Sequence, residues 1–317
     1  MKILLLGLNK SNDYAQDCLF HGLYKLYGNN VVDSDPLNFM FKDAPKLNPE
    51  PMLHGKGFTL YHQLIGFSNT DRENCLEKST NNFYDLIVFA SIRRKFPNSY
   101  SLLNNIKTPI AFVDGEDDAM VDARLFNRWI YFKRELVFDS QEIKNLFPFP
   151  LSVPLERCRE TINENPKHTL APLIPYDEKT YIYNNDVEYL DMYANSIFGL
   201  AYGALTHYPR GTKPQWDSYR FYEMMSQGCI PLIPNIEKFP KNCCVNLPKE
   251  LLISAYKKYH YVLTEKVDIN KILQEPEMTM MRKVVLQHAR DHCTTIECAK
   301  NFIKKVSKFY NLTADSF

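Results

Sequence analysis

The chain has 317 residues, of which 45% are hydrophobic and 24% are charged. These fractions are those of an ordinary globular protein, so they exclude a wholly disordered or collagen-like chain, and the length predicts about two domains. Lysine and arginine number 38 against 37 aspartate and glutamate residues, and this net charge of +1 gives no support to a nucleic-acid partner.

The composition also bears on nucleotide binding and on location. The chain has 11 glycines, which is about half the number expected from their usual share of about 7% of residues. A nucleotide would therefore have to be bound by side chains and a helix terminus. Eight cysteines fit a reduced intracellular protein. The apolar run at residues 3–8 is too short for a secretory signal, and no window approaches 18 apolar residues, so we expect a soluble, cytoplasmic protein.

Short apolar runs alternate with helical patterns in the first half of the chain, which is typical of a parallel α/β sheet. Residues 3–8 are almost continuously apolar, as in a strand buried on both faces. Residues 13–27 repeat apolar side chains at helical spacing and end at Gly28. Further strands are predicted at 31–33, 84–90, 109–114 and 135–138. The long insertion at 39–70 is typical of a functional loop.

A proline-dense stretch around residues 147–175 is interpreted as the connection between two lobes. Beyond it, strands are predicted at 180–183, 197–202 and 229–233, and a mostly helical tail at 248–310. The two predicted domains are therefore residues 1–150 and residues 151–317.

The most informative segment is 208–234, which contains a short helix with clear ends. Asp217 or Ser218 can cap its N-terminus, and Gly228 stops it just before the strand at 229–233. A helix N-terminus offers unpaired N–H groups and a positive dipole, so it is suited to binding an anion.

Four charged residues surround this helix start. Arg210 and Lys213 lie in the loop that leads to it, and Arg220 and Glu223 lie three residues apart on one helix face. Two cations and a helix start suit a diphosphate, and a carboxylate suits ribose hydroxyls. The alternative is a surface ion pair between Arg220 and Glu223, with Arg210 and Lys213 simply solvated.

The donor-site motif of exostosin-like and related GT-B glycosyltransferases is a D-x-x-R-x-x-E helix followed by G-[CA]-[IV]-P. It is similar to the run Asp217-Ser218-x-Arg220-x-Tyr222-Glu223-x4-Gly228-Cys229-Ile230-Pro231. The resemblance covers roughly residues 180–255, and the rest of the chain has a compatible layout.

This resemblance implies two Rossmann-like lobes with a cleft between them. The N-terminal lobe at 1–150 would bind an acceptor, and the C-terminal lobe at 151–317 would bind a nucleotide-diphosphate sugar. It implies that Arg220 contacts the diphosphate, that Glu223 contacts ribose or sugar hydroxyls, and that Lys213 is a second phosphate ligand. No cofactor is expected, and a divalent metal is possible but not essential. We assign donor binding to Arg210, Lys213, Asp217, Ser218, Arg220 and Glu223.

The sequence departs from the family pattern in two places. Residues 160–180 are short and proline-rich where family members often carry a further strand–helix–strand unit, so the C-terminal lobe is expected to be reduced. A Glu-x7-Glu pair, as in many retaining members, is not found, and Asp217 lies six residues before Glu223. Retention and inversion therefore both stay open.

An acidic cluster, Asp114-Gly115-Glu116-Asp117-Asp118, directly follows the predicted strand at 109–113. Open α/β sheets bind ligands at this end of their strands, and crowded carboxylates raise one another's pKa, as a general base requires. Asp114 and Asp117 are the candidates for taking a proton from an acceptor hydroxyl. The alternatives are a divalent cation site and a solvated acidic turn that caps a helix.

The remaining polar motifs are weaker. The basic-aromatic stretches at 93–96 and 128–135 could stack on sugars or bases, but amphipathic packing is favoured. His21, His54 and His62 are possible acid/base groups. Four cysteines lack zinc-ligand spacing and are interpreted as packing residues, namely Cys243, Cys244, Cys293 and Cys298.

The sequence thus predicts a glycosyltransferase that moves a sugar from a nucleotide-diphosphate donor to a hydroxyl of a glycan acceptor. Two alternatives are kept. One is a glycosyltransferase acting on modified DNA bases, and the other is a non-catalytic nucleotide- or sugar-binding protein with the same fold.

Overall fold

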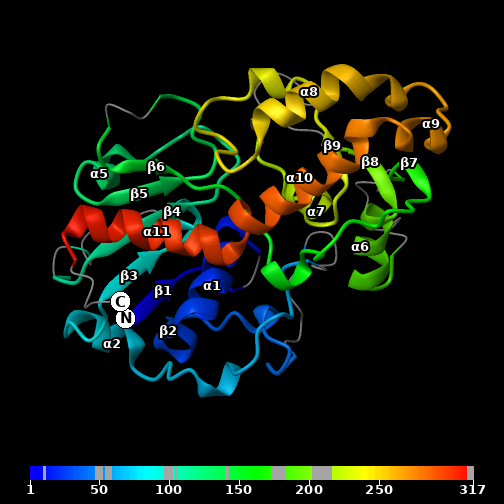
Figure 1. The fold of residues 1–317 in the computed structure, drawn as a ribbon. Helices are drawn as coiled ribbons and strands as arrows, with labels where there is room; N and C mark the ends of the chain where they lie inside the picture. Colours follow the sequence, from blue (N-terminus) through cyan, green and yellow to red (C-terminus); the bar gives the residue numbers. More distant parts are fainter. Residues whose placement is uncertain are drawn as a thin grey trace.

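The computed structural model describes residues 1–9, 12–46, 53, 59–95, 103, 106–139, 143–172, 183–201 and 216–312. They form two α/β lobes, each built on a parallel sheet (Figure 1). The predicted α/β class is therefore confirmed.

The first lobe holds a six-stranded sheet in the order β2-β1-β3-β4-β5-β6, with every pair parallel. Because the chain adds β2 on one side of β1 and β3 on the other, the order reverses beside β1, where open sheets bind ligands. Its strands are β1 (Ile3–Leu6), β2 (Val31–Asp33), β3 (Leu86–Phe89), β4 (Ile110–Asp114), β5 (Ile130–Lys133) and β6 (Leu146–Pro148). Its helices are α1 (Tyr14–Tyr27), α2 (Cys75–Thr80), α3 (Ile92–Lys95) and α5 (Ala123–Phe126).

Successive residues of these strands point to opposite faces of the sheet, and both faces are buried. Ile3 and Leu5 belong to one core, which includes α1 and the last helix of the chain, α11 (Thr295–Tyr310). Leu4 and Leu6 belong to the other core, beneath α2, α3 and α5. Burial on both faces explains the continuous apolar runs in the sequence.

The predicted strand at 135–138 is wrong. The chain instead forms β5 at Ile130–Lys133 and β6 at Leu146–Pro148. β5 was hidden in a basic-aromatic stretch because it ends on Lys133, a lysine whose side chain is completely buried beside Asp114. β6 contains a proline, which an edge strand tolerates because one side of its backbone needs no partner.

The second lobe is also an α/β unit, and its reduced size stays a prediction, because 173–182 and 202–215 lie outside the described residues. Its described part carries a three-stranded parallel sheet in the order β7-β8-β9. The strands are β7 (His168–Leu170), β8 (Ser196–Leu200) and β9 (Ile230–Leu232), and the helices are α6 (Asp186–Ala194), α7 (Tyr219–Ser226), α8 (Lys249–Tyr259), α9 (Ile269–Leu273) and α10 (Pro276–His292). β7 and α6 were not predicted. Apart from Tyr183, the strand predicted at 180–183 lies outside the described residues.

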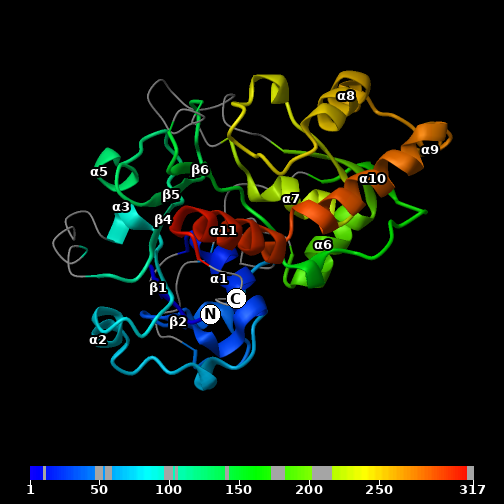
Figure 2. The same cartoon turned by 60° about the vertical axis from the view of Figure 1, so that its left-hand side comes forward.

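The chain crosses between the lobes twice, and the two crossings lie side by side. The first is the linker at 151–153, and the second is the junction of α10 and α11. Val153 donates its N–H to the Cys293 carbonyl and accepts from the Thr295 N–H, both at 2.9 Å. Figures 1 and 2 show α10 leading out of the second lobe into α11, which lies across the first. The last helix thus packs on the first lobe, although the predicted boundary at 150/151 assigns it to the second.

The cysteines and the helices bear on the expected packing role of cysteine and on the search for a membrane-spanning segment. All eight cysteines are buried and free, and four of them, Cys243, Cys244, Cys293 and Cys298, were predicted to be packing residues. In the described part of the chain, no helix combines the length and apolarity needed to cross a membrane.

The contact between α1 and α11 depends on Gly22. A Cβ atom at this position would lie 2.0 Å from the backbone carbonyl oxygen of Thr295, which is too close for any side chain. The two helix backbones therefore approach closely here, and glycine is needed for space.

Gly22→Ala should lower the free energy of unfolding by about 1–2 kcal/mol, because the clash outweighs the gain in helix propensity. Urea denaturation measures this change. The comparison variant is Gly199→Ala, whose new methyl group would meet the flexible side chain of Met224 and should be milder. Equal stability of Gly22→Ala and the parent would show that the helices do not approach this closely.

Candidate functional site

The predicted helix in the donor motif is present as α7, at the boundary between the lobes. It begins at Tyr219 after Ser218, whose side chain makes no capping hydrogen bond. It ends before Gly228, where a φ of +71° favours glycine. α7 presents its start toward the first lobe, because Tyr219 stacks on Tyr14, the first residue of α1, with ring centroids 4.7 Å apart.

Glu223 is the central acidic residue of this site. Its side chain is buried, with 6% of the residue exposed, and both carboxylate oxygens accept hydrogen bonds. The Thr59 hydroxyl donates to Oε1 at 2.5 Å, and the Tyr189 hydroxyl donates to Oε2 at 2.6 Å. Burial raises the pKa of Glu223, opposed by these two hydrogen bonds and by the charge of Arg220. Glu223 is therefore not part of a surface ion pair.

Asp217 lies at the other side of the α7 start and faces the linker. Its Oδ2 accepts from the Leu151 N–H at 2.9 Å, and its Oδ1 accepts from the Tyr222 hydroxyl at 2.7 Å. The residue is 4% exposed, and burial raises its pKa. Through these contacts Asp217 fixes the start of α7 to the interlobe crossing.

The structure describes six of the eight predicted site residues. Arg210 and Lys213 fall in the segment 202–215, outside the described residues. Arg220 is half-buried on α7, close enough to Glu223 for its charge to oppose the rise in that group's pKa. The structure thus places Arg220 and Glu223 on one short helix and Asp217 and Ser218 just before its start. Their roles in donor binding stay predictions.

The acidic cluster lies across the boundary, at the carboxyl end of β4. Asp114 is completely buried and accepts from the Arg93 Nε at 2.8 Å, from the Tyr131 hydroxyl at 2.7 Å and from the Lys133 Nζ at 3.2 Å. Burial lowers the pKa of Lys133, and Asp114 opposes that shift. With its oxygens enclosed by these donors, Asp114 organises the ends of β3, β4 and β5.

Asp117 is more accessible than Asp114. Its side chain is 22% exposed and forms an ion pair with Arg134. Glu135, which follows Arg134 in the chain, accepts hydrogen bonds from the N–H groups of Trp216 and Asp217 at 3.0 and 3.1 Å. A short chain of contacts therefore joins the acidic turn of the first lobe to the start of α7 in the second.

Sequence reasoning missed several members of this site. Arg93 and Lys133 were assigned to amphipathic packing. Yet Arg93 follows β3 and Lys133 ends β5, and these two strands flank β4 in the sheet. That strand order is the signal that could have paired them with the acidic cluster. Thr59 and Tyr189 carry no local signal, because they reach Glu223 from 164 and 34 residues away in sequence.

The histidine candidates do not gather at this site. His21 is buried against α11, with its Nδ1 2.8 Å from the Thr295 hydroxyl. His62 is exposed. His54 lies outside the described residues. Among the residues that the structure describes, no group of three histidine, cysteine or acidic side chains is arranged to hold a metal ion.

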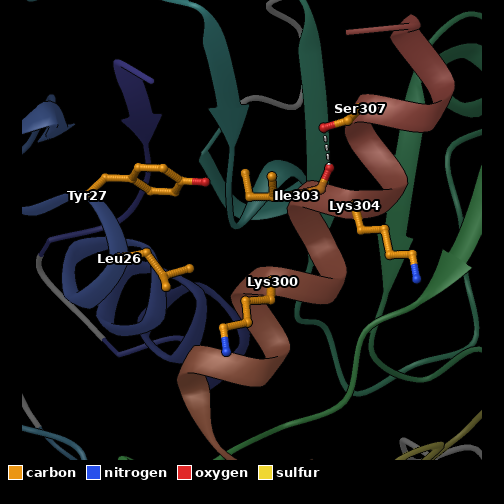
Figure 3. Close-up of a pocket in the computed structure, with 6 residues that line it drawn as sticks. All are labelled: Leu26, Tyr27, Lys300, Ile303, Lys304 and Ser307. Carbon is orange, nitrogen blue, oxygen red and sulfur yellow. Dashed lines mark hydrogen bonds between the residues drawn. The ribbon is translucent and has the colours of Figure 1, made fainter. Parts of the chain in front are cut away.

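A surface hollow of about 410 Å³ lies elsewhere, between the C-terminal turn of α1 and the middle of α11 (Figure 3). Its lining residues are Leu26, Tyr27, Lys300, Ile303, Lys304 and Ser307. Leu26 is twelve residues along α1 from Tyr14, which places the hollow roughly 18 Å from the α7 contact. It is therefore separate from the site around Glu223.

No protein-family model matches this sequence, and no curated protein matches it. Solved structures with a similar fold do exist. One is an alpha-glucosyltransferase in complex with UDP and a 13-mer DNA containing a central A:G mismatch, with a TM-score of 0.50, 10% identity, and coverage of 97% of this chain and 100% of that one. Another is AviGT4, a glycosyltransferase involved in avilamycin A biosynthesis, with a TM-score of 0.51, 10% identity, and coverage of 99% of both chains. At this identity the likeness shows the fold, which is GT-B.

Asp217→Asn should lower the free energy of unfolding by about 1–3 kcal/mol. Asp217 accepts from the Leu151 N–H and the Tyr222 hydroxyl, and the NH2 of an asparagine would face one of these two donors. Thermal and urea denaturation measure the loss. Asp191→Asn, an exposed aspartate on α6, is the matched control and should change stability by less than about 0.5 kcal/mol. A parental stability for Asp217→Asn would contradict its role at the linker.

Proposed function

We propose that this protein is a glycosyltransferase, which moves a sugar from a nucleotide-diphosphate donor to a hydroxyl acceptor. The observation that carries the proposal is the pair Arg220 and Glu223 on α7, set at the boundary of two GT-B lobes. A cation beside a helix start suits a diphosphate, and a carboxylate already bound to two hydroxyls suits a ribose. The exostosin-like type of donor site is part of this proposal.

Donor binding falls to the second lobe. Arg220, with Arg210 and Lys213 in the preceding loop, neutralises the diphosphate, and the N–H groups at the start of α7 add to this. The same charges stabilise the diphosphate as it leaves, which is where negative charge develops in the transition state. Glu223 holds hydroxyls of the donor, Asp217 sets the position of the helix, and Ser218 at the helix start leaves its hydroxyl uncommitted to capping. No metal is needed for these roles.

The acceptor hydroxyl binds at the first lobe, beside the acidic turn. In an inverting transfer, its oxygen forms a bond to the anomeric carbon while the bond from that carbon to the diphosphate oxygen breaks. A carboxylate takes the hydroxyl proton. Of the two candidates Asp114 and Asp117, the exposure of Asp117 favours it, because Asp114 is enclosed by Arg93, Tyr131 and Lys133.

The acceptor that we propose is a glycan. DNA carrying hydroxylated bases is the second candidate, and it is favoured by one observation. A solved structure with the same fold is an alpha-glucosyltransferase bound to DNA, so this fold accommodates a duplex in spite of our expectation against a nucleic-acid partner. Transfer assays with an oligosaccharide and with hydroxymethylated DNA separate the two. A non-catalytic binding protein would bind donor without transferring sugar to either.

Isothermal titration with UDP and GDP tests the donor site. The parent should bind one of them, and Arg220→Ala should raise the dissociation constant roughly 10- to 100-fold, because a charge-assisted contact is lost.

The matched control for this measurement is Arg124→Ala. Arg124 lies on α5 and pairs with Asp122, the residue before that helix, so its removal should leave binding unchanged. Failure of the parent to bind any nucleoside diphosphate would overturn the proposed function. Equal binding by Arg220→Ala and the parent would remove Arg220 from the donor site.

Asp117→Asn should reduce kcat for sugar transfer about 100-fold or more while the dissociation constant for donor stays within about twofold, since a general base acts only in the chemical step. Steady-state assays with the acceptor found above provide the measurement. Asp114→Asn is the comparison, and its main effect should be lower stability, because Lys133 loses its buried partner. Undiminished turnover by Asp117→Asn would exclude it as the base.

A further inference from the structure

We propose that Thr59 is an interlobe latch, which occupies on Glu223 the place of a donor hydroxyl and must be released when donor binds. This inference rests on the proposed function, and it concerns the regulation of the same site. Donor binding would then be coupled to movement of the two lobes.

The latch is a direct contact between the lobes. Thr59 belongs to the long insertion of the first lobe, and Glu223 belongs to α7 of the second. Their hydrogen bond of 2.5 Å joins two residues that are 2% and 6% exposed. Water therefore does not replace this contact freely, and a ligand that reaches the Glu223 carboxylate must rearrange it.

The chemistry of the contact matches that of a ribose. A carboxylate accepts hydrogen bonds from hydroxyl groups, and a ribose presents two of them side by side. In the structure, each oxygen of Glu223 accepts from one hydroxyl, Thr59 on Oε1 and Tyr189 on Oε2. The two protein hydroxyls thus satisfy the carboxylate as a diol would.

The two hydroxyls differ in where they come from. Tyr189 lies on α6, in the same lobe as Glu223, so it stays in place when the lobes move and orients the carboxylate. Thr59 moves with the first lobe. Tyr61, two residues along, is anchored there by its hydroxyl, which donates to Asp17 of α1 at 2.9 Å.

The surroundings support a closed interlobe contact at this point. Tyr14 of the first lobe lies between two rings, stacking on Tyr219 of α7 at 4.7 Å and on Tyr61 at 6.1 Å. The aromatic stack joins α1 to α7, and the latch joins the insertion to α7, so both are contacts between the lobes. Opening the lobes to admit a nucleotide would separate both.

Thr59→Val and Tyr189→Phe each remove one hydroxyl from Glu223, and the proposal expects opposite effects. Thr59→Val removes a competitor, so the dissociation constant for UDP or GDP should fall roughly three- to tenfold. Tyr189→Phe removes an orienting contact, so the dissociation constant should rise. Thr59→Ser keeps the hydroxyl and should bind as the parent does. Isothermal titration measures all four proteins, and Thr59→Ala replaces Thr59→Val if the latter does not fold.

The outcomes separate the latch from the donor site itself. Suppose that the parent binds nucleotide and that Glu223→Gln abolishes this binding. If Thr59→Val then binds no more tightly than the parent, the latch is overturned and the proposed function stands. If the parent binds neither nucleotide, the proposed function fails, and the latch is then decided by small-angle X-ray scattering without nucleotide. A larger radius of gyration for Thr59→Val than for Thr59→Ser would support it, and equal radii would overturn it.

Discussion

The fold depends on a buried crossing between the lobes, at residues 151–153. A buried backbone must find a partner for each N–H and carbonyl group, and here the partners come from distant parts of the chain. The Leu151 N–H reaches Asp217, the Leu151 carbonyl accepts from the Asn246 side chain, and Val153 pairs with the start of α11. Since Asp217 lies two residues before the first residue of α7, the same contacts that satisfy the linker also set the place of Arg220 and Glu223.

The elements that could be predicted from the sequence are those whose signals are local. Strands buried on both faces appear as continuous apolar runs, so β1, β3 and β4 were found to within a few residues. β5 was missed because one of its four residues is a lysine, which is buried through a contact with a distant part of the chain. Lys133 is buried only because Asp114, nineteen residues earlier, supplies its charge partner, and no local pattern contains that information.

The candidate site divides in the same way. α7 has a polar residue before its start and a glycine after its end, and its charged residues lie at helical spacing, so the helix and its charges could be predicted. The environment of Glu223 could not. The spacing of Arg220 and Glu223 is compatible with an exposed ion pair, and burial beneath Thr59 and Tyr189 follows from the packing of two lobes.

The paired crossings also limit how the lobes can move. Because the linker and the α10–α11 junction are hydrogen-bonded to each other, a sliding motion of one lobe along the other would break those bonds. Rotation about the paired segment would leave them intact. We therefore expect opening to follow a single hinge axis along the paired segment. The paired crossings thus restrict the direction in which the lobes can part, and the contact between Thr59 and Glu223 lies on the boundary that such a rotation opens.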